Sequence, residues 1–411
     1  MPIFNVLSCA SLSAFCDPAG GTVTAYLVQH ERDGIAVVVM DDPSGRTNRT
    51  TAQFKAELGA LLDRIEVNPP RGVVFTSAKP GFGAGGDIAE VLGHATHGAS
   101  DSRADSENLK ALFRRIERLA CPVVAAVGGL AVGGGWELAL ACHARFCLED
   151  PSIRLGLPEV ALGLVPGGGG LVRLPHMIGG RGAGRLIGQG LLQGPQQALA
   201  SGLLTGLAST PTTMLQRACD WIAANPDACQ PWDLPGHQPQ DTARYDGPLP
   251  GGAAPGLALE AIANILAQPF DAGSAIESEL FARLAVSAET QALIGLRFQD
   301  RNTLRRHPVD TGWAARFATL LTGLSTTAQA AAVLQELRAG RVHSAAAANT
   351  VSVQAGFPAT TGGVLRYLAG GPLSAADAQA IRAAQEADLA AVSPKSSGPS
   401  GATIPDKGRM V

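Results

Sequence analysis

Short apolar runs alternate with amphipathic helical stretches near the start of the chain, and this alternation restricts the fold more than any other feature. Residues 23–42 hold two β-rich runs around a charged break at 31–34, which predicts a hairpin. The apolar residues of 50–67 recur at helical spacing, whereas the short runs 72–77 and 122–127 are typical of buried strands. This order predicts an α/β fold with a mainly parallel sheet and helices on its faces.

Composition favours a large apolar core and argues against an electrostatic partner. Hydrophobic residues make up 46% of the 411 residues, charged residues 16%, and the formal net charge is −3. We therefore expect no nucleic acid and no membrane as partners. The seven cysteines include no CxxC pair, and the chain start lacks the basic residues of a signal peptide, so we expect a cytoplasmic protein. His94 and His97 have metal-like spacing without a third ligand nearby, so we expect a solvated loop there and no metal site.

The first candidate site is the glycine-rich stretch 79–88, KPGFGAGGDI, directly after a predicted strand. Its Gly81-x-Gly83-x-x-Gly86 spacing formally matches the dinucleotide fingerprint. The loop follows the third candidate strand rather than the first, and the next strand carries no acidic residue at a convincing ribose-binding distance, so a nicotinamide site is disfavoured. A structural turn and a ligand-cradling loop both remain open, and we favour the second because glycine lets backbone N–H groups approach a ligand.

The second glycine-rich stretch ends in a carboxylate placed among apolar residues. Residues 128–138 read GGLAVGGGWEL, and the helical pattern that follows puts Gly134 near a helix N-terminus, where free N–H groups favour an anion. Glu137 lies in this stretch, and Glu159 follows 22 residues later in a second apolar segment. Each glutamate alone could be a helix cap. Two carboxylates in apolar surroundings next to two glycine loops instead indicate acid–base catalysis, because burial raises their pKa values.

Three stretches of the chain resemble the signature segments of the crotonase (enoyl-CoA hydratase/isomerase) superfamily. They are KPGFGAGGDI at 79–88, CPVVAAVGGLAVGGGWELALACHARF at 121–146, and LGLPEVALGLVPGGGGLVRLPHMIG at 155–179. The resemblance covers about residues 25–215 and is greatest to the hydratase domain of the multifunctional fatty-acid β-oxidation α-subunit. It implies a crotonase-like spiral core of ββα units.

The resemblance also implies roles for individual residues. The N–H groups of Gly86 and Gly134 would form an oxyanion hole for a thioester carbonyl, Glu137 would take the proton from the attacking water, and Glu159 would supply a proton to the α-carbon. Further contacts to the substrate and its coenzyme A part would come from Gly83, Ala84, Gly85, Asp87, Ile88 and Gly167. The implied reaction is the hydration of a 2-enoyl-CoA to a 3-hydroxyacyl-CoA, with coenzyme A as part of the substrate and no other cofactor.

The sequence leaves other functions open, both enzymatic and non-enzymatic. A crotonase-type isomerase or acyl-CoA hydrolase would use the same site, although such relatives usually lack one or both glutamates. A non-catalytic subunit that binds coenzyme A and a partner protein is the alternative from another class. We expect the chain to act as a homo-oligomer or as a partner subunit that takes an acyl-CoA thioester.

The second half of the chain has a different composition. Prolines crowd the segment 226–256, and helical patterns follow it. AGFPATTGGVLRYL at 355–368 resembles a stretch in the last helical unit of the dehydrogenase part of multifunctional relatives, but the residues before it are too few for a dinucleotide-binding domain, so no NAD is expected. The predicted organisation is an extension at 1–24, a crotonase domain at 25–225, a linker at 226–256, an α-helical remnant of the dehydrogenase part at 257–391, and a disordered tail at 392–411.

Overall fold

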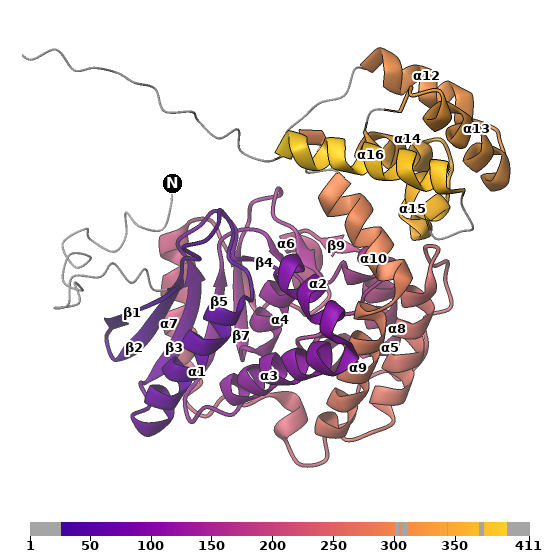
Figure 1. The fold of residues 1–411 in the computed structure, drawn as a ribbon. Helices are drawn as coiled ribbons and strands as arrows, with labels where there is room; N and C mark the ends of the chain where they lie inside the picture. Colours follow the sequence, from indigo (N-terminus) through magenta and orange to yellow (C-terminus); the bar gives the residue numbers. More distant parts are fainter. Residues whose placement is uncertain (1–25, 301–303, 306–310, 343, 370–373, 393–411) are drawn as a thin grey trace, which may run out of the picture. The chain divides into compact units, whose positions relative to one another are not determined.

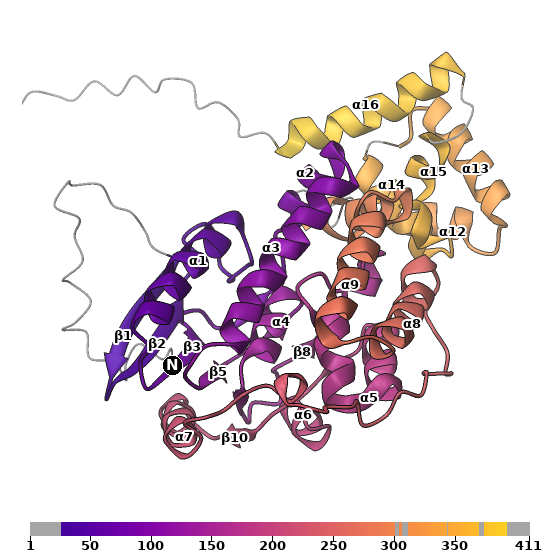
Figure 2. The same ribbon diagram turned by 90° about the horizontal axis from the view of Figure 1, so that it is seen from below.

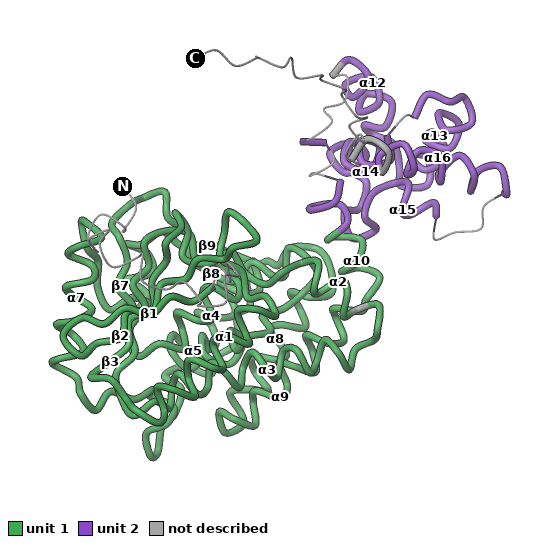
Figure 3. Tube along the Cα trace, turned by 60° about the vertical axis from the view of Figure 1, so that its left-hand side comes forward, with its two compact units in different colours: residues 1–294 green, residues 295–411 purple. Residues whose placement is uncertain are grey.

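The computed structural model of the chain consists of two compact units, residues 1–294 and 295–411 (Figure 3). The described residues are 26–300, 304–305, 311–342, 344–369 and 374–392. The extension predicted at 1–24 lies outside them, as does the predicted tail apart from its first residue, Val392.

The first unit is built on a six-stranded sheet (Figure 1). In spatial order its strands are β1 (Leu27–Arg32), β2 (Ile35–Met40), β3 (Gly72–Ser77), β5 (Val123–Val127), β7 (Ala144–Leu148) and β10 (Gly206–Ala208). The predicted hairpin is confirmed, because β1 pairs with β2 in an antiparallel register that joins Arg32 to Ile35. All other neighbours in this sheet are parallel, as the alternation of strands and helices predicts.

Helices cover both faces of this sheet, and the strand residues alternate between the two cores. Helices α1 (Ala52–Val67) and α3 (Ala99–Glu117) lie on one side, and α7 (Pro211–Ala224) lies on the other (Figure 2). Successive side chains of a strand point to opposite faces. On β2, Val38 therefore joins the core of α1 and α3, whereas Val37 joins the core of α7. A strand buried on both faces reads as a continuous apolar run, and this explains the sequence of β2, IAVVVM.

A second, smaller sheet gathers short strands from distant parts of the sequence. Its order is β4 (Gly83–Ala84), β6 (Ala131–Val132), β8 (Leu155–Gly156) and β9 (Leu192–Gln193). Strands β4, β6 and β8 are parallel, and only β9 is antiparallel to its neighbour. Because parallel strands end at the same edge of a sheet, the segments that follow β4, β6 and β8 emerge side by side.

The remaining helices of the first unit pack around this small sheet. They are α2 (Ile88–His97), α4 (Gly134–Ala141), α5 (Gly170–Gln189), α6 (Pro195–Ala200), α8 (Ala253–Leu266), α9 (Phe270–Ala285) and α10 (Ala288–Ile294), with a 3₁₀ turn η3 at Glu159–Leu162. Helix α8 packs on α5, and α9 packs on α3 and α8 (Figure 1). The loop predicted for His94 and His97 was wrong, since both residues form the last turn of α2.

The proline-rich segment 226–256 does not divide the two compact units. Its regular structure is the 3₁₀ turn η4 (Pro231–Asp233) and, at its end, the first residues of α8, and it packs on the first unit. The side chain of Gln230 donates to the carbonyl oxygens of Ala141 and Cys142 at 3.0 and 3.1 Å. The N–H of Gly180 in α5 donates to the carbonyl of Asp241 at 2.6 Å. The boundary between the units consequently falls after Ile294, rather than at this segment.

The second unit is α-helical throughout its described parts. Its elements are a π-helical turn η5 (Gly295–Asp300), α12 (Thr311–Leu321), α13 (Thr326–Arg338), α14 (Ala345–Gln354), η6 (Ala359–Thr361), α15 (Val364–Ala369) and α16 (Ala375–Val392). The side chain of Asn349 on α14 accepts the N–H of Leu365 on α15 at 2.9 Å. Arg366 forms two hydrogen bonds with Asp300, at 2.6 and 2.7 Å, and so ties α15 to η5. None of the described helices is long and apolar enough to cross a bilayer.

The packing of α8 on α5 predicts that a substitution in α8 destabilises the first unit. Ile265 is fully buried in the core shared with α5, so Ile265→Ala removes contacts and leaves a cavity that costs about 2–5 kcal/mol. Urea unfolding followed by tryptophan fluorescence measures this loss. Val67→Ala, at an 87% exposed position of α1, is the control and should cost less than about 0.5 kcal/mol. Equal stability of the two variants would contradict the placement of α8 in this core.

Candidate active site

The small sheet brings the two glycine-rich loops into direct contact. An added Cβ on Gly83 would lie 2.7 Å from the Cα of Gly135, so the two backbones touch and neither position accepts a side chain. Where the loops leave their strands, Gly85 and Gly133 adopt left-handed conformations with φ values of 86° and 53°. An added Cβ on Gly133 would lie 3.1 Å from the Cα of Gly85. The stretches 83–86 and 133–135 therefore lie against each other.

Thr50 lies beside both residues predicted to supply oxyanion-hole donors. Its N–H donates to the carbonyl of Gly85 at 3.0 Å, and it forms an isolated parallel bridge with Gly86. An added Cβ would lie 2.7 Å from the Thr50 hydroxyl if built on Gly134 and 3.7 Å from it if built on Gly86. Gly134 is the first residue of α4, where an N–H group has no carbonyl partner within the helix. The structure thus brings Gly86 and Gly134 together around Thr50.

Glu137 lies in the first turn of α4 and is 2% exposed. Its Oε1 accepts the N–H groups of Gly168 and Gly170 at 2.7 and 2.8 Å, and these residues belong to the glycine run that starts α5. Burial, followed by the negative charge of Glu277, raises the pKa of Glu137 to about 7, although the two N–H donors oppose the shift. This carboxyl group therefore exchanges its proton near neutral pH.

Glu159 begins the 3₁₀ turn η3, which follows β8. Its Oε1 lies against the left-handed turn of the second glycine loop, 2.9 Å from an added Cβ on Gly133. Its Oε2 is buried and has no hydrogen-bond partner among the residues that the structure describes. Burial, followed by the charge of Glu137, raises the pKa of Glu159 well above its ordinary value. Glu137 is thus buried, and Glu159 is partly buried with an enclosed Oε2, beside the glycine loops.

Five of the other predicted binding residues continue along β4 into α2, whereas Gly167 lies before α5 and contacts Ser106 on α3 and Phe281 on α9. Gly83 and Ala84 form β4, and Gly85 follows it. Asp87 caps α2 by accepting the N–H of Ala89 at 2.9 Å and also pairs with Arg49 at 2.7 Å, so its carboxylate serves the local structure. Ile88 is the first residue of α2 and is partly buried, and the carbonyl of Gly167 accepts the Ser106 hydroxyl at 2.6 Å.

Comparison with known proteins assigns the part of the chain that holds these residues to a family. Residues 30–229 match the enoyl-CoA hydratase/isomerase family. The fatty acid oxidation complex subunit alpha of Shewanella putrefaciens is 36% identical over 283 residues, which cover 65% of this chain and 40% of that protein. The protein of the same name from Idiomarina loihiensis is 43% identical over 183 residues, 44% of this chain and 26% of that one. An enoyl-CoA hydratase structure from Bacillus halodurans, 18% identical, covers 66% of this chain and 98% of its own with a TM-score of 0.50, which shows a common fold.

Residues 30–229 form an enoyl-CoA hydratase/isomerase domain of the crotonase superfamily. The predicted resemblance and the predicted fold class are both confirmed. The chain spans about 40% or less of the length of these two curated relatives.

The sequence analysis missed two charged residues near Glu137, one within the hydratase/isomerase domain and one that follows it in the chain. Glu277 on α9 is fully buried, and Arg173 on α5 is 2% exposed. Arg173 pairs with the buried carboxylate of Glu117 on α3 at 2.6 Å and donates to the carbonyl of Gly168 at 2.8 Å. One signal could have found Glu277, because it lies at helical spacing between Gly273 and Leu280 on the stripe that α9 buries. No group of His, Cys, Asp and Glu residues suited to a metal occurs in the described parts of the chain.

The raised pKa of Glu137 predicts how the stability of the domain depends on pH. The folded protein keeps this proton up to about pH 7, whereas an unfolded chain releases it near about pH 4.3. Between those values the folded state binds more protons, so the free energy of unfolding falls as pH rises, by about 1 kcal/mol per pH unit from this group. Glu137→Gln removes this dependence and should gain stability over the wild type as pH rises.

Urea unfolding from about pH 5 to about pH 8 measures the effect. Glu149→Gln, at an exposed carboxylate of the same domain, is the matched control and should follow the wild type. A Glu137→Gln curve parallel to that of the wild type would show that Glu137 titrates normally.

Proposed function

We propose that the hydratase/isomerase domain catalyses the reversible syn addition of water to a 2-enoyl-CoA, which gives a 3-hydroxyacyl-CoA. The observation that carries this proposal is the meeting of two carboxyl groups with closely approaching glycine backbones: the buried Glu137, the partly buried Glu159 with its enclosed Oε2, and the backbones at Gly85 and Gly133. The reaction needs a group that takes a proton from water, a group that protonates the α-carbon, and donors for a developing oxyanion.

In the proposed mechanism the thioester carbonyl lies between the N–H groups of Gly86 and Gly134. Attack of water at the β-carbon shifts electrons toward the carbonyl oxygen and produces an enolate-like transition state. A fixed donor to such an oxygen is typically worth about 3–4 kcal/mol. The N–H of Gly134 has the added advantage of the positive end of the α4 dipole.

We assign the two carboxyl groups different roles in the reaction. Glu137, with a pKa of about 7, is about half ionised at neutral pH and takes the proton from water. Glu159, whose pKa burial raises well above its ordinary value, donates a proton to the α-carbon. Their charges interact, so the two groups titrate as a pair.

The substrate class follows from family membership, and the proposal names no further cofactor. Coenzyme A enters as part of the thioester, and no step of the hydration transfers a hydride to NAD. The relatives named as fatty acid oxidation complex subunits alpha suggest enoyl thioesters from fatty acids as the first substrates to test.

Substitution of either glutamate tests the proposal directly. Glu137→Gln and Glu159→Gln should each lower kcat by about 10²–10⁴, which is the range that general acid–base catalysis supplies. The activity of the wild type should also fall on the acid side of about pH 7, because Glu137 must be ionised to accept a proton. Loss of the enoyl-thioester absorbance measures the rate with acyl groups of short, medium and bulky structure.

Glu149→Gln is the control and should keep wild-type activity, because its carboxylate is exposed. A parallel assay for free thiol, together with product analysis, separates the rival functions. Thiol release would identify a hydrolase, and migration of the double bond without hydration would identify an isomerase. No turnover with any enoyl-CoA would favour a non-catalytic subunit that binds coenzyme A.

The proposed oxyanion hole predicts a loss of activity from one added methyl group. In Gly134→Ala the new Cβ would lie 2.7 Å from the Thr50 hydroxyl and would push Gly134 and Thr50 apart. We expect kcat to fall by about 10²–10³, the usual effect of removing an oxyanion donor. Gly93→Ala on α2 is the control, since its methyl group would meet no atom within 4 Å. Full activity of Gly134→Ala would exclude this position from the oxyanion hole.

A further inference from the structure

The turn at residues 168–170 is held by two buried carboxylates that come from different helices. Glu137 on α4 accepts the N–H groups of Gly168 and Gly170 at 2.7 and 2.8 Å. Glu277 on α9 accepts the N–H of Gly169, which lies between them, through Oε1 at 2.5 Å. Its Oε2 accepts the N–H of Val172 at 3.3 Å. Successive N–H groups of the turn therefore point alternately to Glu137 and to Glu277.

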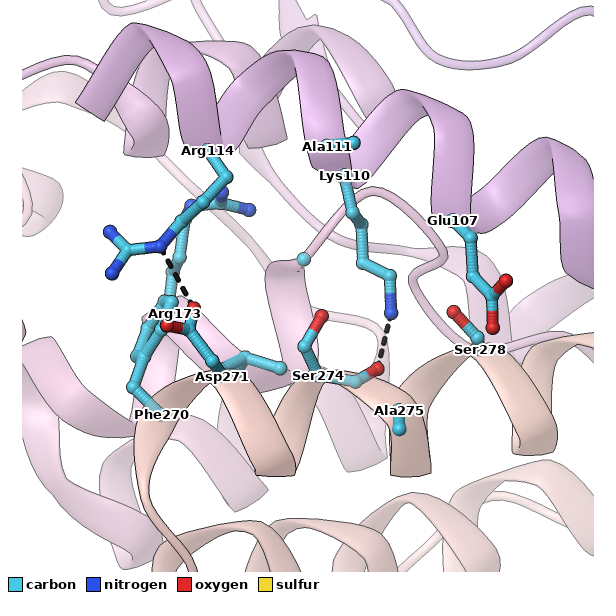
Figure 4. A pocket seen from close by; sticks show the side chains of 12 residues that line it. Glu107, Lys110, Ala111, Arg114, Arg173, Phe270, Asp271, Ser274, Ala275 and Ser278 are labelled. Carbon is cyan, nitrogen blue, oxygen red and sulfur yellow. Dashed lines mark hydrogen bonds and ion pairs between the residues drawn. The ribbon is translucent and has the colours of Figure 1, made fainter. Parts of the chain in front are cut away.

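The turn borders open space on the side of α9. Gly169 lines a cavity of about 280 Å³ between α3 and α9, shown in Figure 4. Its φ of 104° is a left-handed conformation, and an added Cβ would lie 1.7 Å from Nη1 of Arg173. The Gly169 peptide thus has Arg173 close on one side and the cavity on another, so packing does not enclose it fully and hydrogen bonds help to fix its direction. Glu277 supplies the bond to its N–H.

Glu277 binds the turn through hydrogen bonds, and its charge also acts on Glu137. Burial raises the pKa of Glu277, whereas Lys110 on α3 and Arg173 on α5 favour its ionised form. Lys110 is itself held by a hydrogen bond to the carbonyl of Ser274, one turn before Glu277 on α9 (Figure 4). After burial, Glu277 is the largest cause of the raised pKa of Glu137, and its charge also reaches Glu159.

We propose that Glu277, outside the span that matches the family, is a positioning residue for the hydration: it orients the 168–170 turn that orients Glu137, and its negative charge acts on Glu137 directly. This inference rests on the proposed function in so far as Glu137 is the base. Glu277 touches neither substrate nor reacting atoms in this role. It acts through the peptide groups of the 168–170 turn and through the effect of its own charge on Glu137.

Two substitutions separate the hydrogen bonds from the charge. Glu277→Ala removes both, and misplacement of the base should lower kcat by about 10- to 100-fold with little change in KM. Glu277→Gln keeps an oxygen acceptor for Gly169 but removes the charge. It should retain most of kcat and move the acid limb of the kcat/KM profile to lower pH by about 1 unit, because Glu137 then ionises more easily.

Glu279→Gln is the matched control. This residue lies on the same helix, is 68% exposed and pairs with Arg103 at 2.9 Å. It should keep both the rate and the pH profile of the wild type. Equal kcat for Glu277→Ala and Glu279→Gln, or an unmoved acid limb in Glu277→Gln, would overturn the proposal.

Infrared difference titration of the full chain gives a second readout that does not need turnover. The carboxylic C=O band that disappears in Glu137→Gln belongs to Glu137, and it should titrate at lower pH in Glu277→Gln than in the wild type. An unchanged titration would overturn the link between the two acids, even if Glu277→Ala did not fold. If the wild type shows no hydratase activity but the Glu137 band still titrates at lower pH in Glu277→Gln, the hydratase function is rejected and the link between the two acids is supported.

Discussion

A carboxylate removed from water requires donors, and this requirement organises the centre of the first unit. Glu137 and Glu277 obtain donors from the peptide N–H groups of one glycine run, and Glu117 obtains them from Arg114 and Arg173. Glu159 is the exception, because its buried Oε2 has no partner in the described part of the chain. A buried acid without a partner favours its protonated form, which suits the role proposed for Glu159 as a proton donor.

The small sheet explains how residues from distant segments reach this centre. Each of β4, β6 and β8 is only two residues long, yet their parallel pairing sets the register of three loops at one edge. The loops can approach closely because Gly83 and Gly135 lack side chains at the point of contact. The backbone therefore positions the proposed oxyanion donors. Helix α4 and the turn η3, which come after β6 and β8, position the side chains of Glu137 and Glu159.

Features carried by local patterns could be predicted from the sequence, and features made by distant contacts could not. The hairpin at β1 and β2, the helix that starts at Gly134 and the burial of Glu137 all follow from short patterns. The role of segment 226–256 was harder, because prolines predict a lack of regular structure but not whether the segment packs on a neighbour. Glu277 was missed because the N–H groups it accepts lie more than 100 residues earlier in the chain.

The boundary after Ile294 has a consequence for how this chain can be recombined with others. The match to the enoyl-CoA hydratase/isomerase family model ends at residue 229, which would suggest a splice point there. A fusion or exchange at that position would separate α8 and α9 from the domain, uncover the apolar side of α5 and take Glu277 away from its turn. The described part of the first unit, residues 26–294, holds all the residues of this centre. A fusion or domain exchange should therefore be made after Ile294.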